Sequence, residues 1–454
     1  MEFKDKRVLV FGSGKSGIAA AELLMKEGVQ LVLFEGNEEA DIQKIREKTE
    51  AFAHADIYIG ALPKTVICTL DMAVLSPGVP TDLPLVNRMR DAGVFLLGEL
   101  ELAFLFARGR LIAITGTNGK TTTTSLVGEI LADYFEDTQV VGNIGIPYTS
   151  VAADTKDTTV TVAEVSSFQL ETIHSFRPQV SAILNITPDH LNRHHTMENY
   201  IKAKEDITMN QDAEDICVLN YEDEVLRKFG EGLKTQVMYF SSKRPVEYGC
   251  YYKDDIIYYV SGGKTQQVVH VDELNILGIH NYENVMAAVC MTAAIGVPMN
   301  KIIGVLHRFQ AVEHRIEYVT EKNGVRYYND SKGTNPDAAI KGIQAMNRPT
   351  YLIGGGYDKQ SEYDEWIESF DGKVRKLVLI GETKGKIAFC AKLHGFLDYV
   401  FADSLEEAVD ICSEEAEPGE AVLLSPACAS WDMFTSYEER GRIFKELVYN
   451  LKEQ

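Results

Sequence analysis

The segment Ile114–Thr124, ITGTNGKTTTT, decides the fold, because it has the form of a phosphate-binding loop between a strand and a helix. The usual loop reads G-x-x-x-x-G-K-[ST]. Residues 119–121 supply the G-K-T, but Gly116 is the nearest glycine before them, so the spacing is two residues short. The alternative is a glycine- and threonine-rich turn in which a threonine caps the helix.

The flanking sequence favours the phosphate loop. An apolar strand pattern, RLIAIT, comes before it, and a helical pattern follows to about Tyr134. In this setting Gly116 and Gly119 let backbone N–H groups point at a phosphate. Lys120 would reach the outer phosphates, and the Thr121 hydroxyl would bind Mg²⁺. We therefore predict a nucleotide site here.

The composition narrows the class of protein. The chain has 454 residues, and roughly 150 residues per domain makes three domains the central expectation. A net charge of −22 disfavours nucleic acid as a partner. The charged N-terminus is unlike a signal peptide, and the sequence predicts no membrane span. Seven scattered cysteines without a CxxC pair fit a reducing cytoplasm.

Strand and helix patterns repeat as three α/β units in tandem. We place the domains at residues 1–98, 99–311 and 312–454. Residues 248–272 alternate in polarity and turn at Gly-Gly, which predicts an antiparallel insert in the second unit. The third unit opens with a hairpin whose tip is Asn323-Gly324.

A second glycine motif lies near the N-terminus. Gly12, Gly14 and Gly17 form G-x-G-x-x-G after a strand, and Glu35 ends the next strand. This pattern is typical of dinucleotide binding, so a nicotinamide-dependent dehydrogenase is one alternative function. The unit nevertheless ends after about 98 residues, short of a full six-strand dinucleotide domain.

The loop T-G-T-N-G-K-T is similar to the short ATP loop of the Mur ligases, which add amino acids in peptidoglycan synthesis, and of the related folylpolyglutamate synthetases. Further motifs follow in the family's order, and NDSKGTNP and SPACASWD resemble its D-glutamate-adding branch. The motifs are GNIGIP (142–147), EVSSFQLE (164–171), NITPDHLNRH (185–194), GIHNYEN (278–284), EHR (313–315), NDSKGTNPDA (329–338), GGGYDK (354–359) and LLSPACASWDMF (423–434).

The resemblance implies three tandem α/β domains: an N-terminal Rossmann-like domain, a central P-loop ATPase-like domain and a C-terminal Rossmann-like domain. They would bind, in that order, a UDP-sugar, ATP and the amino acid. The implied enzyme is a cytoplasmic, monomeric, ATP-dependent ligase that joins D-glutamate to UDP-N-acetylmuramoyl-L-alanine. ATP and two Mg²⁺ ions are the implied cofactors.

Carried over position by position, the resemblance assigns residues to each ligand. The catalytic residues would be Lys120, Glu164, His190 and Lys204. ATP would contact Gly116, Thr117, Asn118, Gly119, Lys120, Thr121, Thr122, Asn281, Asn284, Arg315 and Asp330. The UDP-sugar would contact Gly14, Lys15, Ser16, Gly17, Glu35, Ser76, Asn143, Ser166 and Arg193. D-Glutamate would contact Thr334, Lys332, Lys359, Ser430 and Tyr437. Mg²⁺ would be held by Thr121, Glu164, His190 and Lys204.

Several of these residues have plainer interpretations. Glu164 would otherwise be a solvated glutamate at the end of a strand. Because that strand is apolar and an unpaired carboxylate is costly to bury, a nearby cation would explain it. A lone histidine such as His190 is usually structural. Lys204 reads as a solvated helix lysine unless CO₂ carbamylates it, as the resemblance implies. Asn281 and Asn284 would otherwise cap a helix. Asn192, where the family often has Asp, weakens any carboxylate role at that position.

Three other functions stay open on the sequence. The dehydrogenase would bind its cofactor at residues 12–17. A nonenzymatic module would bind ATP without transferring phosphate. Within the ligase class, another Mur ligase or a folate ligase is the nearest alternative.

Overall fold

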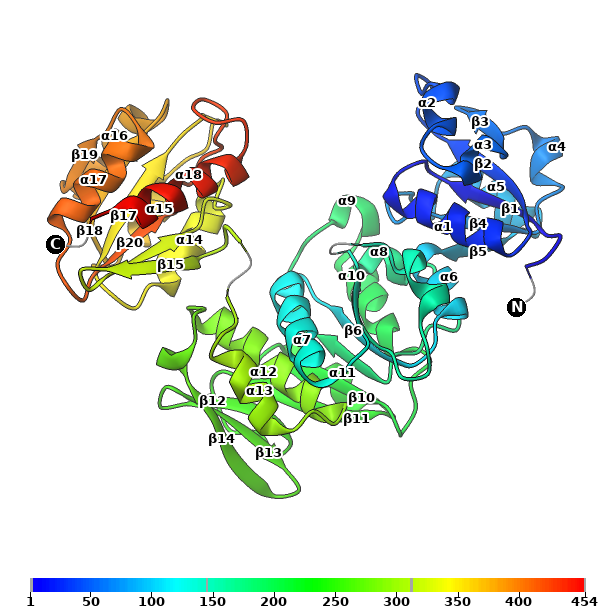
Figure 1. Cartoon of the computed structure of the whole chain (residues 1–454), viewed down its shortest axis with the longest axis horizontal. Coiled ribbons are helices and arrows are strands. Elements are labelled where there is room, and N and C mark those ends of the chain that lie inside the picture. The colour runs from blue at the N-terminus through cyan, green and yellow to red at the C-terminus, as the bar shows by residue number, and fades with distance from the viewer. Residues whose placement is uncertain (1–2, 144–145, 311–312, 453–454) are drawn as a thin grey trace. The chain divides into compact units, whose positions relative to one another are not determined.

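A computed structural model describes residues 3–143, 146–310 and 313–452. Three sheets, each with its own helices, follow one another along the chain, and their colours run from blue to red in Figure 1. The predicted series of three α/β domains is therefore confirmed. In the described chain, no helix combines the length and the apolar character needed to cross a membrane.

The N-terminal sheet has five parallel strands in the order β3-β2-β1-β4-β5. Its strands are β1 (Arg7–Phe11), β2 (Gln30–Glu35), β3 (Asp56–Ile59), β4 (Met72–Leu75) and β5 (Phe95–Gly98). Its helices are α1 (Lys15–Lys26), α2 (Ile42–Arg46), α3 (Glu50–Ala53), α4 (Lys64–Ile67), α5 (Pro84–Asp91) and α6 (Glu99–Phe106). The sequence analysis missed β3, a short strand at the edge of the sheet.

Strand β1 is apolar from Val8 to Phe11 because both faces of the sheet are covered. Val8 and Val10 pack in one core with Leu24 of α1, whereas Leu9 packs in a second core with Val86 of α5. The alternation of side chains between the two faces thus buries every second residue against a different helix layer.

The central sheet has nine strands in the order β14-β13-β12-β11-β10-β9-β6-β8-β7. Its strands are β6 (Arg110–Thr115), β7 (Thr138–Gly142), β8 (Val160–Glu164), β9 (Val180–Ile183), β10 (Ile216–Asn220), β11 (Gln236–Ser241), β12 (Gly249–Lys253), β13 (Ile256–Ser261) and β14 (Lys264–His270). Its helices are α7 (Lys120–Tyr134), α8 (Ser167–Leu170), α9 (Leu191–His194), α10 (Met197–Glu205), α11 (Glu224–Glu231), α12 (Ile279–Ala294) and α13 (Met299–Leu306).

Strands β6 to β11 pair in parallel, and the predicted insert extends this sheet rather than standing apart. Strand β12 pairs in parallel with β11 and antiparallel with β13. The turn at Gly262-Gly263 was predicted, but the earlier turn at Asp254-Asp255 was missed. Both of these aspartates have positive φ, a conformation that Asp tolerates in tight turns.

The C-terminal sheet has six strands in the order β15-β16-β20-β17-β18-β19. Its strands are β15 (Glu317–Lys322), β16 (Val325–Asn329), β17 (Thr350–Gly355), β18 (Val374–Ile380), β19 (Tyr399–Phe401) and β20 (Ala421–Leu424). Its helices are α14 (Pro336–Ala345), α15 (Asp364–Glu368), α16 (Lys384–Leu393), α17 (Leu405–Glu415) and α18 (Tyr437–Asn450). The hairpin tip is confirmed: Asn323 and Gly324 have φ of 50° and 78°, as a type I′ turn requires.

Contacts divide the chain into two compact units. The first comprises residues 1–268 and 283–305, and the second comprises 269–282 and 306–454. Leu277, which precedes α12, accordingly packs in the core of the C-terminal domain. The predicted boundary between residues 311 and 312 lies outside the described residues. The three sets of domain bounds therefore stay a prediction.

Candidate active site

The short glycine loop lies between β6 and α7, as predicted. Gly116 and Gly119 have φ of 151° and 84°. A Cβ at Gly119 would lie 2.3 Å from Oδ1 of Asn284, so a side chain there would collide with its neighbour. Helix α7 begins at Lys120 without a side-chain cap among the described residues. Its first N–H groups and the positive end of its dipole are therefore suited to an anion.

Asn185 holds this loop in shape. Its Oδ1 accepts from the Asn118 N–H at 2.8 Å, and its Nδ2 donates to the Asn118 carbonyl at 3.1 Å. The Thr117 hydroxyl donates to the Thr187 carbonyl at 3.1 Å and lies 2.9 Å from the hydroxyl of Tyr200. No role was predicted for Asn185, which lies within the motif NITPDHLNRH. Its position just beyond β9 was the available signal, since β9 neighbours β6.

Two lysines share one carbonyl at the loop. Lys120 Nζ donates to the carbonyls of Gly116 and Thr117, both at 2.9 Å, and Lys204 Nζ donates to the same Gly116 carbonyl at 2.8 Å. The Lys204 side chain is buried, so the solvated-lysine interpretation is wrong. Burial, together with the Lys120 charge, lowers the pKa of Lys204 to about 7. A large fraction of Lys204 is thus a neutral amine at neutral pH.

Glu164 ends β8 and is buried. Its Oε1 accepts from Asn143 Nδ2 at 3.0 Å. Its Oε2 is buried and has no hydrogen-bond partner among the residues that the structure describes. An orphaned carboxylate oxygen is costly in a protein interior and is a suitable donor to a hard cation. The predicted Mg²⁺ role of Glu164 therefore fits its surroundings, and the interpretation as a solvated strand end is wrong.

His190 is one of three histidines between residues 190 and 195. It adopts a positive φ of 52° at the start of α9, and its Nε2 lies 3.4 Å from Asp189. Half of its side chain is exposed, so the ring is available to a ligand. His194, by contrast, is buried and bonded to Ser167 at 3.0 Å and to Glu171 at 3.3 Å. His194 is the structural histidine of this segment.

The N-terminal glycine loop is also without a side-chain cap at its helix, α1, within the described chain. A Cβ at Gly17 would lie 1.9 Å from the Gly12 carbonyl, so this close approach requires glycine. The Ser76 hydroxyl is buried beside Gly12 without a partner in the described residues. Gly14, Lys15 and Ser16 form the entry to α1.

Glu35 is already engaged by this loop. Its carboxylate accepts from the Ser13 N–H at 3.1 Å and from the Ser13 hydroxyl at 2.6 Å. Lys48 adds a contact that the sequence analysis missed, donating to the Ser13 carbonyl at 2.9 Å. Nothing in the local sequence of Lys48 signals this contact, which the fold brings across from the segment between α2 and α3.

Ser166 and Arg193 are held by their own neighbours. Ser166 caps α8 in a reciprocal capping box with Gln169. Arg193 Nη2 donates to Glu171 at 2.7 Å and to the Val79 carbonyl at 2.9 Å. Arg193 thus links the segment after β4 to the segment after β9.

Helix α12 begins at Ile279, so the helix-capping interpretation of Asn281 and Asn284 is wrong. Asn284 Oδ1 accepts from Thr123 Oγ1 at 3.2 Å, which places it against the glycine loop. Asn281 instead donates to the Leu277 carbonyl at 2.7 Å and belongs to the second unit. The structure therefore brings Asn284 to the loop within the first unit. Thr121 and Thr122 lie in the first turn of α7.

In the second unit, Arg315 is exposed and Asp330 is buried. The Asp330 carboxylate accepts from Ser425 Oγ at 2.7 Å and from the Ile316 N–H at 3.3 Å. Burial raises the pKa of Asp330 to about 7. Both carboxylate oxygens already have partners, so the structure gives Asp330 a role in holding the entry to the C-terminal domain.

The residues predicted to bind D-glutamate lie on neighbouring loops of this unit. Lys359 Nζ lies 3.5 Å from the Thr334 carbonyl and 5.3 Å from the centre of the Trp431 ring. Lys332 Nζ lies 5.5 Å from the centre of the Tyr437 ring. Ser430 is buried just before Trp431. Two lysines and two aromatic rings therefore border the carboxyl ends of these strands.

Arg440, which the sequence analysis missed, joins the loops that carry these residues. Its buried guanidinium donates to the Ser331 carbonyl at 2.8 Å and hydroxyl at 3.0 Å, and to the Cys428 carbonyl at 3.2 Å. Burial lowers the pKa of Arg440 to about 10, so it stays charged at neutral pH. Arg440 thus ties NDSKGTNP to SPACASWD.

The comparisons with known proteins agree with this architecture. Residues 6–98 match the Mur ligase MurD-like N-terminal domain, residues 114–292 the Mur ligase middle domain, and residues 314–428 the Mur ligase glutamate ligase domain. The MurF ligase of Thermotoga maritima, solved in complex with ADP, aligns with a TM-score of 0.55 and 15% identity over 99% of this chain and 96% of its own. That likeness shows the fold.

The chain belongs to the Mur ligase family. Its relatives include the UDP-N-acetylmuramoylalanine–D-glutamate ligase of Lachnoclostridium phytofermentans, 56% identical over 100% of both chains. The enzyme of the same name from Lachnospira eligens is 55% identical over 99% of this chain and 100% of its own.

The raised pKa of Asp330 predicts that the stability of the C-terminal domain depends on pH. The pKa of Asp330 rises from 3.8 to about 7 on folding. Its contribution to the free energy of unfolding is therefore complete below pH ~4 and is lost as the pH rises to ~7. Relative to Asp330→Asn, we expect the wild-type free energy of unfolding to fall across this range. The upper limit is about 4 kcal/mol, since one pKa unit corresponds to about 1.4 kcal/mol.

Denaturant titrations at several pH values, followed by tryptophan fluorescence, would measure this difference. Both tryptophans, Trp366 and Trp431, lie in the second unit and report on it. Asp410→Asn, at an exposed position of α17, is the control. Parallel curves for the wild type and Asp330→Asn would contradict the prediction.

Proposed function

We propose that this chain is an ATP-dependent ligase that joins D-glutamate to UDP-N-acetylmuramoyl-L-alanine, in the cytoplasmic stage of peptidoglycan precursor synthesis. The observation that carries the proposal is the 56% identity, over the full length of both chains, to a UDP-N-acetylmuramoylalanine–D-glutamate ligase. The short loop before an uncapped α7 supports the ATP-dependent part. We propose that the chain acts as a monomer.

The chemistry explains why ATP is needed. A carboxylate does not react with an amine at neutral pH, because the leaving group would be oxide. Transfer of the γ-phosphoryl group of ATP to the alanine carboxylate makes an acyl phosphate and releases ADP. The amine of D-glutamate then attacks the acyl carbon, and the tetrahedral intermediate collapses to an amide with phosphate as leaving group.

In the proposed assignment, the nucleotide contacts are Gly116, Thr117, Asn118, Gly119, Lys120, Thr121, Thr122, Asn281, Asn284, Arg315 and Asp330. The loop N–H groups would cradle the phosphates, and Lys120 would stabilise charge that develops on the transferred phosphoryl group. Lys120 Nζ already points into the loop, where it bonds to two carbonyls. The position of Asn284 against Gly119 supports its inclusion.

Mg²⁺ fits the orphaned oxygen of Glu164. Glu164, Thr121, His190 and a carbamylated Lys204 are the residues that would hold two such ions. When bound, Mg²⁺ would neutralise phosphate charge during phosphoryl transfer. Asn143, which donates to Glu164 Oε1, would keep the other carboxylate oxygen directed toward the cation.

The other substrates would bind in the outer domains. We assign the UDP-sugar to Gly14, Lys15, Ser16, Gly17, Glu35, Ser76, Asn143, Ser166 and Arg193. We assign D-glutamate to Thr334, Lys332, Lys359, Ser430 and Tyr437. The uncapped start of α1 supports pyrophosphate binding, because the N–H groups there suit an anion. Lys332 and Lys359 supply charge complementary to the two carboxylates of D-glutamate.

Lys204 is suited to carbamylation. Only the neutral amine attacks CO₂, and burial beside Lys120 favours that form. The product is an anion, so the repulsion between two ammonium groups at the Gly116 carbonyl would become an attraction. The carbamate oxygens would also be appropriate ligands for Mg²⁺.

The substrate assignment is tested by phosphate release from ATP with UDP-N-acetylmuramoyl-L-alanine and a panel of amino acids. We expect turnover with D-glutamate, and rates lower by at least about 10²-fold with L-glutamate, D-aspartate, L-lysine or meso-diaminopimelate. A fluorescence titration with NADH tests the dehydrogenase alternative, in which the cofactor would bind at residues 12–17. Turnover with another amino acid in preference to D-glutamate would overturn the assignment.

Lys120→Ala should separate catalysis from UDP-sugar binding. We expect the variant to lose about 10³-fold or more in kcat, because charge on the transferred phosphoryl group loses its partner. Calorimetric affinity for UDP-N-acetylmuramoyl-L-alanine should stay near the wild-type value. Lys228→Ala, at an exposed lysine of α11, is the matched control. Equal loss of both properties would argue against separate sites.

The carbamate is tested with ¹³C-bicarbonate. We expect one carbamate carbon resonance in the wild type that is absent from Lys204→Gln, together with lower activity after CO₂ removal that bicarbonate restores. Lys202→Gln is the matched control, because Lys202 is exposed on the same helix and pairs with Asp206. A resonance that survives in Lys204→Gln, or activity insensitive to CO₂, would contradict the prediction.

A further inference from the structure

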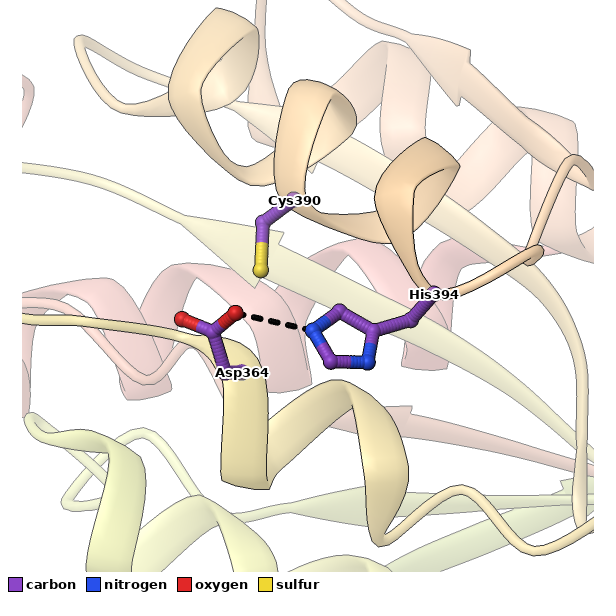
Figure 2. Close-up of side chains that lie close together, drawn as sticks. All are labelled: Asp364, Cys390 and His394. Carbon is purple, nitrogen blue, oxygen red and sulfur yellow. Dashed lines mark hydrogen bonds and ion pairs between the residues drawn. The ribbon is translucent and has the colours of Figure 1, made fainter.

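A cluster of three metal-ligating side chains lies in the C-terminal domain, outside every position assigned above. Asp364, Cys390 and His394 each direct one ligand atom toward a common point, and these atoms all lie within 4.8 Å of one another (Figure 2). Asp364 begins α15, Cys390 lies in α16, and His394 is the C-cap residue directly after α16.

Helical spacing explains how the ligands meet. Cys390 and His394 are four residues apart, so they share one face of α16. Asp364 approaches from α15, and its carboxylate lies 2.8 Å from His394 Nε2. Cys390 is buried in the same core as Trp366 and Ile387, which fixes both helices on the sheet. The cluster is therefore built on packed elements.

The donor set selects the kind of cation. Thiolate and imidazole with one carboxylate suit Zn²⁺, whereas Mg²⁺ and Ca²⁺ prefer oxygen ligands alone. Zn–N and Zn–O bonds of about 2.0–2.2 Å in a tetrahedron place ligand atoms about 3.3–3.5 Å apart. The distance between Asp364 Oδ1 and His394 Nε2 would need to increase by roughly half an ångström to reach this range. The Asp364 side chain is 57% exposed, which gives it room to move.

His394 also has an outer partner. Its Nδ1 lies 3.4 Å from Oε1 of Glu368, which is four residues after Asp364 on α15. A carboxylate at the second ring nitrogen holds that nitrogen as N–H and leaves the lone pair of Nε2 for a metal. This carboxylate–histidine pairing is the usual support of a zinc ligand, and it distinguishes the cluster from a chance meeting of surface charges.

A catalytic thiol is a less suitable interpretation. The dashed contact in Figure 2 joins His394 to Asp364, so the imidazole is turned to the carboxylate and not to the thiol. Burial and the charges of Asp364 and Glu368 raise the pKa of the Cys390 thiol to about 11. Without a cation the thiol is therefore a poor nucleophile.

We propose that Asp364, Cys390 and His394 form a binding site for one Zn²⁺ ion, with water as the fourth ligand. Glu368 supports the site through His394 Nδ1. The ion would join α15 to α16 and so stabilise one helical layer of the C-terminal sheet. The site is independent of the proposed ligase chemistry, because it shares no residue with it.

The test uses the full-length protein after removal of metals, with excess Mg²⁺ to occupy oxygen-donor sites. Competition with a fluorescent zinc chelator would count the bound Zn²⁺. We expect Cys390→Ser and His394→Gln to lose one equivalent per chain relative to the wild type. Glu368→Gln should keep the equivalent but bind it about 10–100-fold more weakly. Cys68→Ser is the matched control, because Cys68 is an exposed cysteine elsewhere in the chain.

Cobalt substitution identifies the ligand atom. Co²⁺ should produce a thiolate-to-metal charge-transfer band in the wild type and in Cys68→Ser but not in Cys390→Ser. Ligase turnover measured without zinc should be equal in all four variants, which also shows that each is folded. Equal zinc stoichiometry in the wild type, Cys390→Ser and His394→Gln, or a cobalt spectrum without a thiolate band, would overturn the proposal.

Discussion

The two lysines that donate to the Gly116 carbonyl place the ammonium group of Lys120 at one loop of a chain whose net charge is −22. The dipole of α7 adds to the same field. Most of the protein therefore repels a nucleotide, whereas this loop attracts it. The local charge also makes Lys204 the weaker base of the pair, since its burial penalises the ammonium form. The proposed binding of phosphate at this loop and the proposed carbamylation of Lys204 would thus have one electrostatic origin.

The short loop is held by residues from other segments of the chain. Gly116 approaches Leu184 so closely that a Cβ would lie 3.0 Å from its side chain, and Gly119 approaches Asn284 more closely still. Asn185 then holds the middle of the loop through both the oxygen and the nitrogen of its side-chain amide. Residues beyond β9 and on α12 thus hold the short loop in its conformation.

Much of the fold could be predicted because it is encoded locally. The apolar run of β1, the glycine loops and the Asn323-Gly324 turn each contain their own signal. The edge strand β19 and the turn at Asp254-Asp255 were missed, since neither has a strong local pattern. The family resemblance located the motifs, but the neighbours of each side chain depend on contacts between distant segments.

Asp330 and Arg440 show where sequence reasoning reaches its limit. Asp330 lies two residues before a motif lysine and is predicted to contact the nucleotide, but its burial and the hydrogen-bond partners of both its oxygens could not be predicted from the sequence. Arg440 looks like one charge among many on the amphipathic helix α18, yet its guanidinium bonds to carbonyls of Ser331 and Cys428. Backbone carbonyls carry no signal in the amino-acid sequence, so such a contact is invisible before the fold is known.

The burial of Arg440 also accounts for the shape of the surrounding loops. A buried guanidinium requires acceptors in several directions, and here they come from two loops that the hydrogen bond from Ser425 to Asp330 also joins. Arg440 binds Ser331, which directly precedes Lys332, and Cys428, which lies two residues before Ser430. The geometry of the proposed D-glutamate site therefore depends on this one side chain. The buried Arg440 guanidinium, with carbonyl oxygens as partners, thus holds the loops that carry Lys332 and Ser430.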